Sequence, residues 1–440
     1  MSASASEPPG ASGPVQLEPG YHYVVISSDS HAGADILDYK PYLESKWHGE
    51  FDAWAAAYGN PWDFVDPRLD KPGFDFGEVE VLTGAASWHS ALSWDSPRRL
   101  LHMDQDGVSA EVIFPNTAPP FMPGSVFAGT GPADRAEYER RWAGLRAHNR
   151  WLADFCAQAP ARRAGIAQVM LQDVQDALDE IARIKEMGLT GGILLPMDSP
   201  TSDSLPLYVS DLEPLWQLCA DLDIPVHKHA PAPPAMPGAE RGGPGVLAIS
   251  FAENHFYNRR GIAHLIFSGV LERHPSLKVI LTEGGAHWIP EHLEHLDKIY
   301  LDGKDERGFR RFLNPAMRPL SLTPSQYFRR NFYVGASLFL PSEARRRHEI
   351  GIGNIMWGVD YPHAEGTFPY SREAISHTFA DVPSDEVYDM LGGTAARVFG
   401  FDLDRLQHVA DRIGPTVADV RTRPARLPSV PEESMSPVFL

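Results

Sequence analysis

Cysteine is scarce in this sequence. Only Cys156 and Cys219 occur among 440 residues, which argues against a disulfide framework or a cysteine-built metal site and favours a reducing compartment such as the cytoplasm. Positive charge is also in deficit, since 39 Lys and Arg stand against 58 Asp and Glu and give a net charge of −19. This balance argues against nucleic acid as a partner and favours a small-molecule substrate.

Long apolar runs are absent as well, so we expect no membrane-spanning segment. Residues 1–20 are rich in Ser, Ala, Gly and Pro and lack the basic start and apolar centre of a signal peptide, which predicts a disordered leader. Residues 406–440 form a C-terminal tail without clear periodicity, which predicts a disordered segment or one that wraps around a neighbour. The intervening residues 21–405 are expected to form one large domain.

Apolar runs alternate with helical patterns throughout this domain. The run Val24–His31 is the first expected strand, and the others are 110–115, 165–170, 191–196, 224–229, 278–283, 331–334 and 354–360. The helices expected between them include 98–106, 135–158, 174–187, 212–222, 262–271 and 342–350. Because strands that alternate with helices form a parallel sheet, about eight such units predict a TIM-type (β/α)8 barrel, an α/β fold.

A long insertion, residues 32–97, follows the first expected strand and contains five tryptophans. Loops of this length inside a compact domain are usually functional, so one interpretation is a lid or a wall of the substrate pocket. The other is a small subdomain whose aromatic side chains simply pack together, or an interface between subunits. Together with the acidic composition, the insertion suggests a homodimer.

Acids and histidines stand at the ends of three expected strands. Asp29 and His31 end the first strand and share a face, because side chains alternate along a strand. His229 ends the fifth strand and Asp360 the eighth. The carboxyl ends of barrel strands meet at one mouth, where these four side chains could hold a divalent ion, most often zinc, with manganese or iron as alternatives.

Three further polar residues are candidates for the same site. His227 shares a face with His229 and competes with it as a ligand, or else contacts substrate. Glu283 ends the sixth strand and could orient substrate, transfer a proton or support a ligand, with a purely structural acid as the alternative. His363 and Glu365 follow the eighth strand, and His363 could contact substrate or serve as a hydrogen-bonding residue of the turn.

Several motifs resemble those of a known family. They are Asp29-Ser30-His31, RLLHMDQDGV at 99–108, PVHKH at 225–229, SGVLERHP at 268–275 and WGVDYPH at 357–363. Together they resemble the amidohydrolase-related metal enzymes, the group that includes aminocarboxymuconate semialdehyde decarboxylase and resorcylate decarboxylase, over residues 24–401. The resemblance implies a barrel with one metal ion held by Asp29, His31, His229 and Asp360, and it favours His229 over His227.

The sequence also departs from this family's pattern. Many relatives carry a histidine on the sixth strand, where this chain has Glu283. The fourth strand, 193–196, has no lysine that could be carboxylated to bridge two metals, so one ion is expected rather than two.

Two reactions fit this site. Our first hypothesis is metal-dependent hydrolysis of a small organic, aromatic or otherwise apolar substrate, in which the ion activates water and Asp360 accepts its proton. The alternative is a non-oxidative decarboxylase that uses the same ion while Asp360 delivers a proton to carbon. A third hypothesis, an inactive barrel used for binding or assembly, predicts that ligand positions are replaced, and none of them is.

Overall fold

The computed structural model describes residues 17–58, 91–116, 119–122, 131–196, 205–229 and 245–440. Most of the predicted leader, all but residues 17–20, therefore lies outside the described residues. Of the insertion, residues 32–58 and 91–97 are described. No helix within these ranges is both long and apolar enough to cross a membrane.

Eight parallel strands form the centre of the molecule and follow one another in chain order. They are β1 (Ile26–Ala32), β2 (Ala110–Pro115), β3 (Arg163–Gln168), β4 (Gly192–Leu194), β5 (Val226–His229), β6 (Val279–Thr282), β7 (Phe332–Ser337) and β8 (Ile355–Gly358). Just beyond β8, the Asp360 N–H donates to the Asp29 carbonyl at 2.9 Å and the His31 N–H donates to the Tyr361 carbonyl at 2.6 Å. These bonds bring the two ends of the sheet together, and the predicted TIM-type barrel is confirmed.

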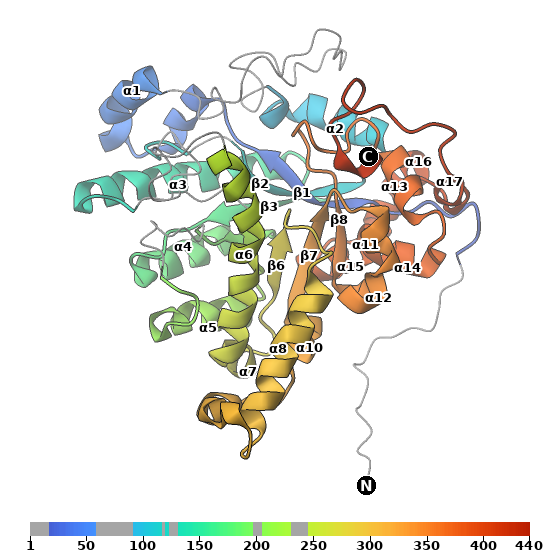
Figure 1. The fold of residues 1–440 in the computed structure, drawn as a ribbon. Helices are drawn as coiled ribbons and strands as arrows, with labels where there is room; N and C mark the ends of the chain where they lie inside the picture. The colour runs from blue at the N-terminus through green and yellow to red at the C-terminus, as the bar shows by residue number, and fades with distance from the viewer. Residues whose placement is uncertain (1–16, 59–90, 117–118, 123–130, 197–204, 230–244) are drawn as a thin grey trace.

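Helices surround this barrel (Figure 1). They are α1 (His48–Ala57), α2 (Ser96–Asp106), α3 (Arg135–Ala157), α4 (Val174–Glu186), α5 (Glu213–Asp221), α6 (Gly245–Phe267), α7 (Val270–Arg273), α8 (Ile289–Lys304), α9 (Asn314–Met317), α10 (Pro324–Asn331), α11 (Pro341–Arg345), α12 (Arg347–Ile350), α13 (Ser371–Phe379), α14 (Ser384–Tyr388), α15 (Thr394–Phe399), α16 (Leu403–Ile413) and α17 (Val417–Arg421). All eight predicted strands are present, with ends that differ from the prediction by a few residues.

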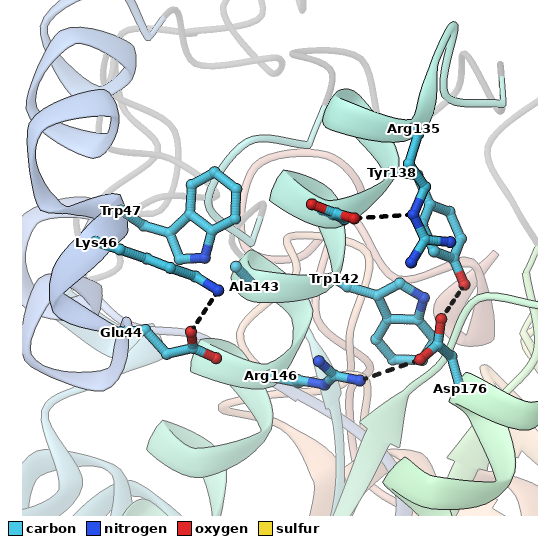
Figure 2. A pocket seen from close by; sticks show the side chains of 10 residues that line it. Glu44, Lys46, Trp47, Arg135, Tyr138, Trp142, Ala143, Arg146 and Asp176 are labelled. Carbon is cyan, nitrogen blue, oxygen red and sulfur yellow. Dashed lines mark hydrogen bonds and ion pairs between the residues drawn. The ribbon is translucent and has the colours of Figure 1, made fainter.

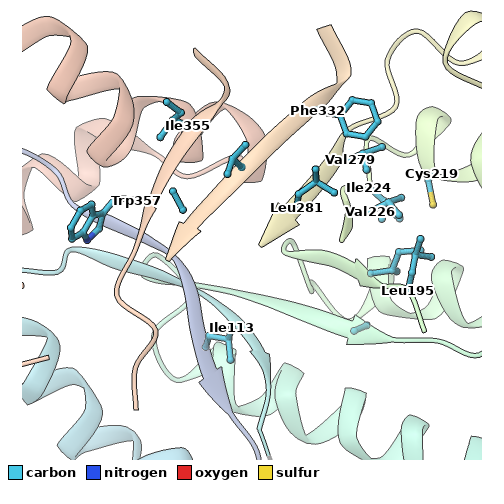
Figure 3. Close-up of a cluster of buried hydrophobic side chains, with 14 of the residues drawn as sticks. Ile113, Leu195, Cys219, Ile224, Val226, Val279, Leu281, Phe332, Ile355 and Trp357 are labelled. Atoms are coloured by element: carbon cyan, nitrogen blue, oxygen red, sulfur yellow. The ribbon is translucent and has the colours of Figure 1, made fainter. Parts of the chain in front are cut away.

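Side chains of the strands alternate between two apolar layers. Trp357 of β8 points to the helices and packs 5.6 Å from the Phe379 ring of α13, within the outer layer seen in Figure 3. Met356, its neighbour, belongs to a second cluster with Ile280 of β6 and Phe399 of α15. Apolar side chains thus fill most of the barrel interior, and most of the polar side chains that face inward lie near the strand ends.

The C-terminal segment has regular structure, although the sequence predicted none. Helix α17 begins with a capping box in which Thr416 and Asp419 bond to each other's backbone, and it buries Val417 and Val420. The final residues bury Val438 and Phe439. A short helix of this kind has too few turns to show a hydrophobic period, which is why the sequence pattern did not reveal it.

A buried charge network connects the first three strands to α2. The Arg99 guanidinium of α2 contacts both carboxylate oxygens of Glu111 on β2, and Arg163 of β3 donates to the same carboxylate at 3.1 Å. Arg99 also donates to the His31 carbonyl at 2.6 Å and lies 4.7 Å from the Tyr361 ring centre. It thereby contacts the chain on both sides of the junction between β1 and β8.

Replacing Arg99 by Met should destabilise the fold strongly. The substitution weakens the charge compensation of Glu111, which is 1% exposed, and removes the donor to the His31 carbonyl. Breaking one partner of such a buried network costs about 3–5 kcal/mol. The matched control is Arg98→Met, because that side chain is 41% exposed and its ion pair with Asp95 is worth about 0–1 kcal/mol. Urea unfolding of the two variants would contradict the prediction if their free energies of unfolding were equal.

Gly358, the last residue of β8, stands where a side chain would make close contacts with two neighbours. A Cβ atom there would lie 3.0 Å from both the Asp29 Cβ and the Ser337 Oγ. Gly358→Ala should therefore lower stability by about 1–3 kcal/mol through overpacking. Gly353→Ala is the control, since a Cβ at that position meets nothing within 4 Å. Thermal unfolding of both variants measures the difference, and equal melting temperatures would be the contrary result.

Candidate metal centre

The site begins with a break in the regularity of β1. Pairing with β2 shifts between Ser27 and Ser30, so that β1 has one residue more than its partner there. The Ser27 hydroxyl donates to the Asp29 carbonyl at 2.6 Å and accepts from the Val359 N–H at 3.0 Å. A β-bulge of this kind redirects the side chains that follow it, and here Asp29 and His31 both face the mouth of the barrel.

His31 stands at the centre of the site. Its Nε2 lies 3.2 Å from Asp29 Oδ1 and 3.1 Å from Asp360 Oδ1, and its Nδ1 lies 3.3 Å from the Pro115 carbonyl. Burial would lower the pKa of this imidazole, but Asp29 and Asp360 together raise it well above its usual value. Two buried carboxylates thus converge on one nitrogen, an arrangement that favours a cation between them.

His229, at the end of β5, approaches the same acid from another side. Its Nε2 lies 3.4 Å from Asp29 Oδ1, and its Nδ1 lies 3.3 Å from Glu283 Oε2. Burial would raise the pKa of Asp29, but the His229 and His31 imidazoles hold it well below its usual range. The Phe114 ring of β2 packs 4.5 Å from His229 and gives the site an apolar wall.

Asp360 is 0% exposed and has a left-handed backbone with φ 60°. Neither of its carboxylate oxygens makes a hydrogen bond, and the same holds for His31 Nε2. Its nearest polar neighbours are His31 and the Nδ1 of His363, which lies 2.9 Å from Asp360 Oδ1. Burial raises the pKa of Asp360, yet His363 and His31 lower it overall. An ionised, buried carboxylate without hydrogen bonds is the expected condition of a metal ligand seen without its ion.

Possible ligand atoms form three overlapping groups, each within 4.8 Å. The first is Asp29, His31 and His229; the second is His31, Asp360 and His363; the third is Glu283, Asp360 and Glu365. The other three predicted ligands therefore each share a group with His31, although they fall into two groups rather than one. Their acid and imidazole atoms suit a divalent transition metal, so the residues present fit such an ion.

Two more of the predicted site residues, His227 and Glu283, differ in position. His227 lies deeper in the barrel, where its Nε2 is 2.7 Å from the Gly191 carbonyl and its ring stacks on Phe399 at 5.7 Å. Burial lowers its pKa to about 3, and it joins none of the three groups. Glu283 faces His229 from a left-handed backbone with φ 57°. Burial and then Asp360 raise its pKa well above the usual value.

The structure adds residues that the sequence analysis did not assign to the site. The Ser337 hydroxyl at the end of β7 donates to Asp29 Oδ2. Asn116, directly after β2, lies with its Oδ1 3.1 Å from His363 Nε2. Both stand at strand ends, which is the only signal that could have marked them, and Phe114 looks in the sequence like any other core aromatic.

A separate cavity of about 260 Å³ lies outside the barrel, between α3, the start of α4 and the turn at Ser45–Trp47 (Figure 2). Its walls include Trp47 and Trp142 together with acids and bases that pair with one another. Examples are Lys46 with Glu44 at 2.9 Å and Arg135 with Glu139 at 2.9 Å. None of the residues around His31 lines it, so it is not part of the metal centre.

Several known proteins resemble much of this chain. A family model described as Amidohydrolase matches residues 113–401. Gamma-resorcylate decarboxylase of Polaromonas sp. strain JS666 is 26% identical over 307 residues, covering 65% of this chain and 86% of the relative. The 2-amino-3-carboxymuconate-6-semialdehyde decarboxylase of Dictyostelium discoideum is 25% identical over 327 residues, covering 70% and 77%.

Solved structures share the fold. A 5-carboxyvanillate decarboxylase from Sphingomonas paucimobilis superposes with a TM-score of 0.61 at 22% identity, covering 86% of this chain and all of that one. A dihydroxybenzoic acid decarboxylase from Polaromonas sp. JS666, solved with bound manganese and 2-nitroresorcinol, gives a TM-score of 0.54 at 20% identity, covering 86% and 97%.

These comparisons correct the first functional hypothesis. We expected a hydrolase, and this expectation is wrong, because these relatives and structural neighbours are decarboxylases. The ligand set could not separate the two reactions, since both need the same ion at the same mouth. The family model covers well over half of the chain, and the chain is an enzyme that belongs to the amidohydrolase family.

Proposed function

We propose that this enzyme is a metal-dependent, non-oxidative decarboxylase of a small aromatic carboxylic acid. The main support for the proposal is that the relatives are decarboxylases and that the site has residues suited to hold a divalent metal ion. Gamma-resorcylate decarboxylases from several bacteria match this chain at 26% identity, over segments that cover up to 65% of it. The four residues expected to hold the ion lie together at the mouth of the barrel, where Asp29 and Asp360 contact His31 and His229 contacts Asp29.

Asp29, His31, His229 and Asp360 would hold the ion. A divalent cation there would bind a substrate carboxylate with its neighbouring oxygen and withdraw negative charge from the ring. Manganese in structural neighbours supports this metal beside zinc, which the ligand types alone favour. We also propose that the enzyme is located in the cytoplasm. Cys156 and Cys219 are both buried free thiols, which suits a reducing compartment.

The reaction needs a proton at carbon. As the bond between the ring and the carboxylate breaks, its electron pair stays on the ring carbon, which takes up a proton while carbon dioxide leaves. We assign delivery of that proton to Asp360, which must first receive it from a neighbouring acid, because His363 and His31 lower the pKa of its own carboxyl group. The neighbouring acids can resupply it, because burial raises the pKa of Glu365 to about 8 and that of Glu283 well above its usual value.

Other residues of the site shape its surroundings. Phe114 packs against both His31 and His229 and keeps water from that side of the imidazoles. Ser337 holds Asp29 through its second carboxylate oxygen, which leaves Oδ1 toward the histidines. His227 receives no role in binding substrate here, because it is 0% exposed and bonded to the Gly191 carbonyl.

The test is carbon dioxide release by manganese-loaded and zinc-loaded protein from a panel of aromatic acids that includes 2,6-dihydroxybenzoate and 5-carboxyvanillate. We expect turnover of at least one compound, with one deuterium placed on the ring when the reaction runs in D₂O. Removal of the ion by a chelator should abolish turnover, and added Mn²⁺ or Zn²⁺ should restore it. Asp360→Asn should reduce kcat by about 10²–10⁴-fold, because the variant has no proton to deliver.

The matched control is Asp381→Asn, whose side chain is 81% exposed and remote from the barrel mouth in sequence and contacts. This variant should keep the wild-type rate. Metal-loaded protein that releases no carbon dioxide from any compound, and exchanges no ring hydrogen for deuterium in the product, would contradict the proposal.

A further inference from the structure

We propose that His363 is an additional ligand of the metal ion rather than a contact for substrate. The inference rests on the metal centre of the proposed function, but not on which reaction takes place there. It adds a third imidazole to the four residues already considered, from the loop that follows β8.

His363 is placed where a ligand must be. Its side chain is 7% exposed and stacks on the His31 ring with the ring centres 4.0 Å apart. Its Nδ1 lies 2.9 Å from Asp360 Oδ1, the same oxygen that lies 3.1 Å from His31 Nε2. The two imidazoles therefore present one nitrogen each to a single carboxylate oxygen.

Hydrogen bonding determines which nitrogen of His363 carries the proton. The Asn116 side chain donates its amide N–H to the Ser93 hydroxyl at 2.7 Å, so its Oδ1 is the atom that faces His363. An acceptor at 3.1 Å from Nε2 places the ring proton on Nε2. In the neutral imidazole the Nδ1 lone pair then points at Asp360 Oδ1, and these two electron-rich atoms repel unless a cation lies between them.

The other two histidines of the centre have the same arrangement. His31 has the Pro115 carbonyl as acceptor for its Nδ1–H, and His229 has the Glu283 carboxylate beside its Nδ1. In each ring one nitrogen faces an acceptor outside the centre while the other faces an acid inside it. Histidines that bind metal ions usually donate their second ring N–H in this way, and His363 follows the pattern as fully as the two expected ligands.

The distances between neighbouring ligand atoms are those found in a coordination shell, although the five residues fall into two groups that share His31. Ligand atoms about 2.0–2.2 Å from an ion lie roughly 2.9–3.5 Å from one another in octahedral or tetrahedral geometry. The measured separations along the centre run from 3.4 Å (His229 to Asp29) through 3.2 and 3.1 Å to 2.9 Å (His363 to Asp360). The His363 pair belongs to the same series, and His363 joins the group of His31 and Asp360 rather than that of Asp29 and His229.

Three imidazoles and two carboxylates have a chemical consequence. A nitrogen-rich set selects transition ions such as Zn²⁺, Mn²⁺, Fe²⁺ or Co²⁺ over Mg²⁺ or Ca²⁺, which prefer oxygen ligands. Five protein ligands also leave less room for water around the ion than four do. The alternative is an imidazolium of His363 that donates to Asp360 as a hydrogen-bonding partner, without contact to the ion.

The experiment counts imidazole ligands directly. Protein freed of metal and loaded with one equivalent of Co²⁺ is studied by proton NMR, in which the ring N–H of each ligating histidine gives a strongly shifted, exchangeable resonance. We expect three such resonances in the wild type and two in His363→Asn. We also expect the Co²⁺ dissociation constant to rise by at least about tenfold in this variant, measured by competition with a chelator.

His102→Asn is the matched control. His102 is also a partly buried histidine beside the junction of β1 and β8, but its Nδ1 bonds to the Tyr361 hydroxyl at 2.9 Å and its ring stacks on Phe368. This variant should keep all three resonances. Circular dichroism and thermal unfolding of both metal-free variants show that the fold is retained.

Several results would overturn the inference. They are two shifted resonances in the wild type, three in His363→Asn, or a wild type that binds no Co²⁺. A protein that shows three resonances and yet releases no carbon dioxide from any aromatic acid would contradict the proposed function while leaving the ligand assignment standing.

Discussion

The structure of the site depends on one electrostatic constraint, the approach of Asp29 and Asp360 to the same nitrogen of His31. Both carboxylates are fully buried, and neither can be ionised there at low cost without positive charge between them. This approach requires the backbone to depart from regular strand geometry. The bulge in β1 turns Asp29 and His31 to the same side, and left-handed residues end β6 and β8 at Glu283 and Asp360. Such local strain persists only where the surroundings hold it in place.

Those surroundings are a second set of buried charges, behind the first. Glu111 holds Arg99 and Arg163 together, and Arg99 extends from this network to the His31 carbonyl and to the face of the Tyr361 ring. The backbone on both sides of the metal centre is thus fixed by a side chain that touches no ligand atom. Gly358 also permits this arrangement, because β8 approaches Asp29 so closely that a Cβ at this position would lie only 3.0 Å from the Asp29 Cβ.

Sequence periodicity was sufficient to predict the barrel, its eight strands and the strand ends at which Asp29, His31, His229 and Asp360 stand. Periodicity could not predict the direction in which these side chains point. In a regular strand Ser28 would face the same side as Ile26, and Asp29 would face the opposite side. The bulge changes this alternation and turns Asp29 toward the mouth of the barrel. Likewise, the direction of His363 depends on Asn116 and Ser93, which come from distant parts of the chain. The reaction could not be predicted from the sequence either, since hydrolysis and decarboxylation would use the same acids and imidazoles.

The junction between β1 and β8 has a consequence for how this protein is made. Asp29 is synthesised long before Asp360, yet their backbones bond to each other and their side chains face the same imidazole. The centre can therefore be completed only after the eighth strand has been synthesised. Contacts between such distant residues form late and slowly in folding. An ion captured across this junction would bind the finished barrel far better than any nascent fragment of it, so metal uptake would report that the barrel has closed.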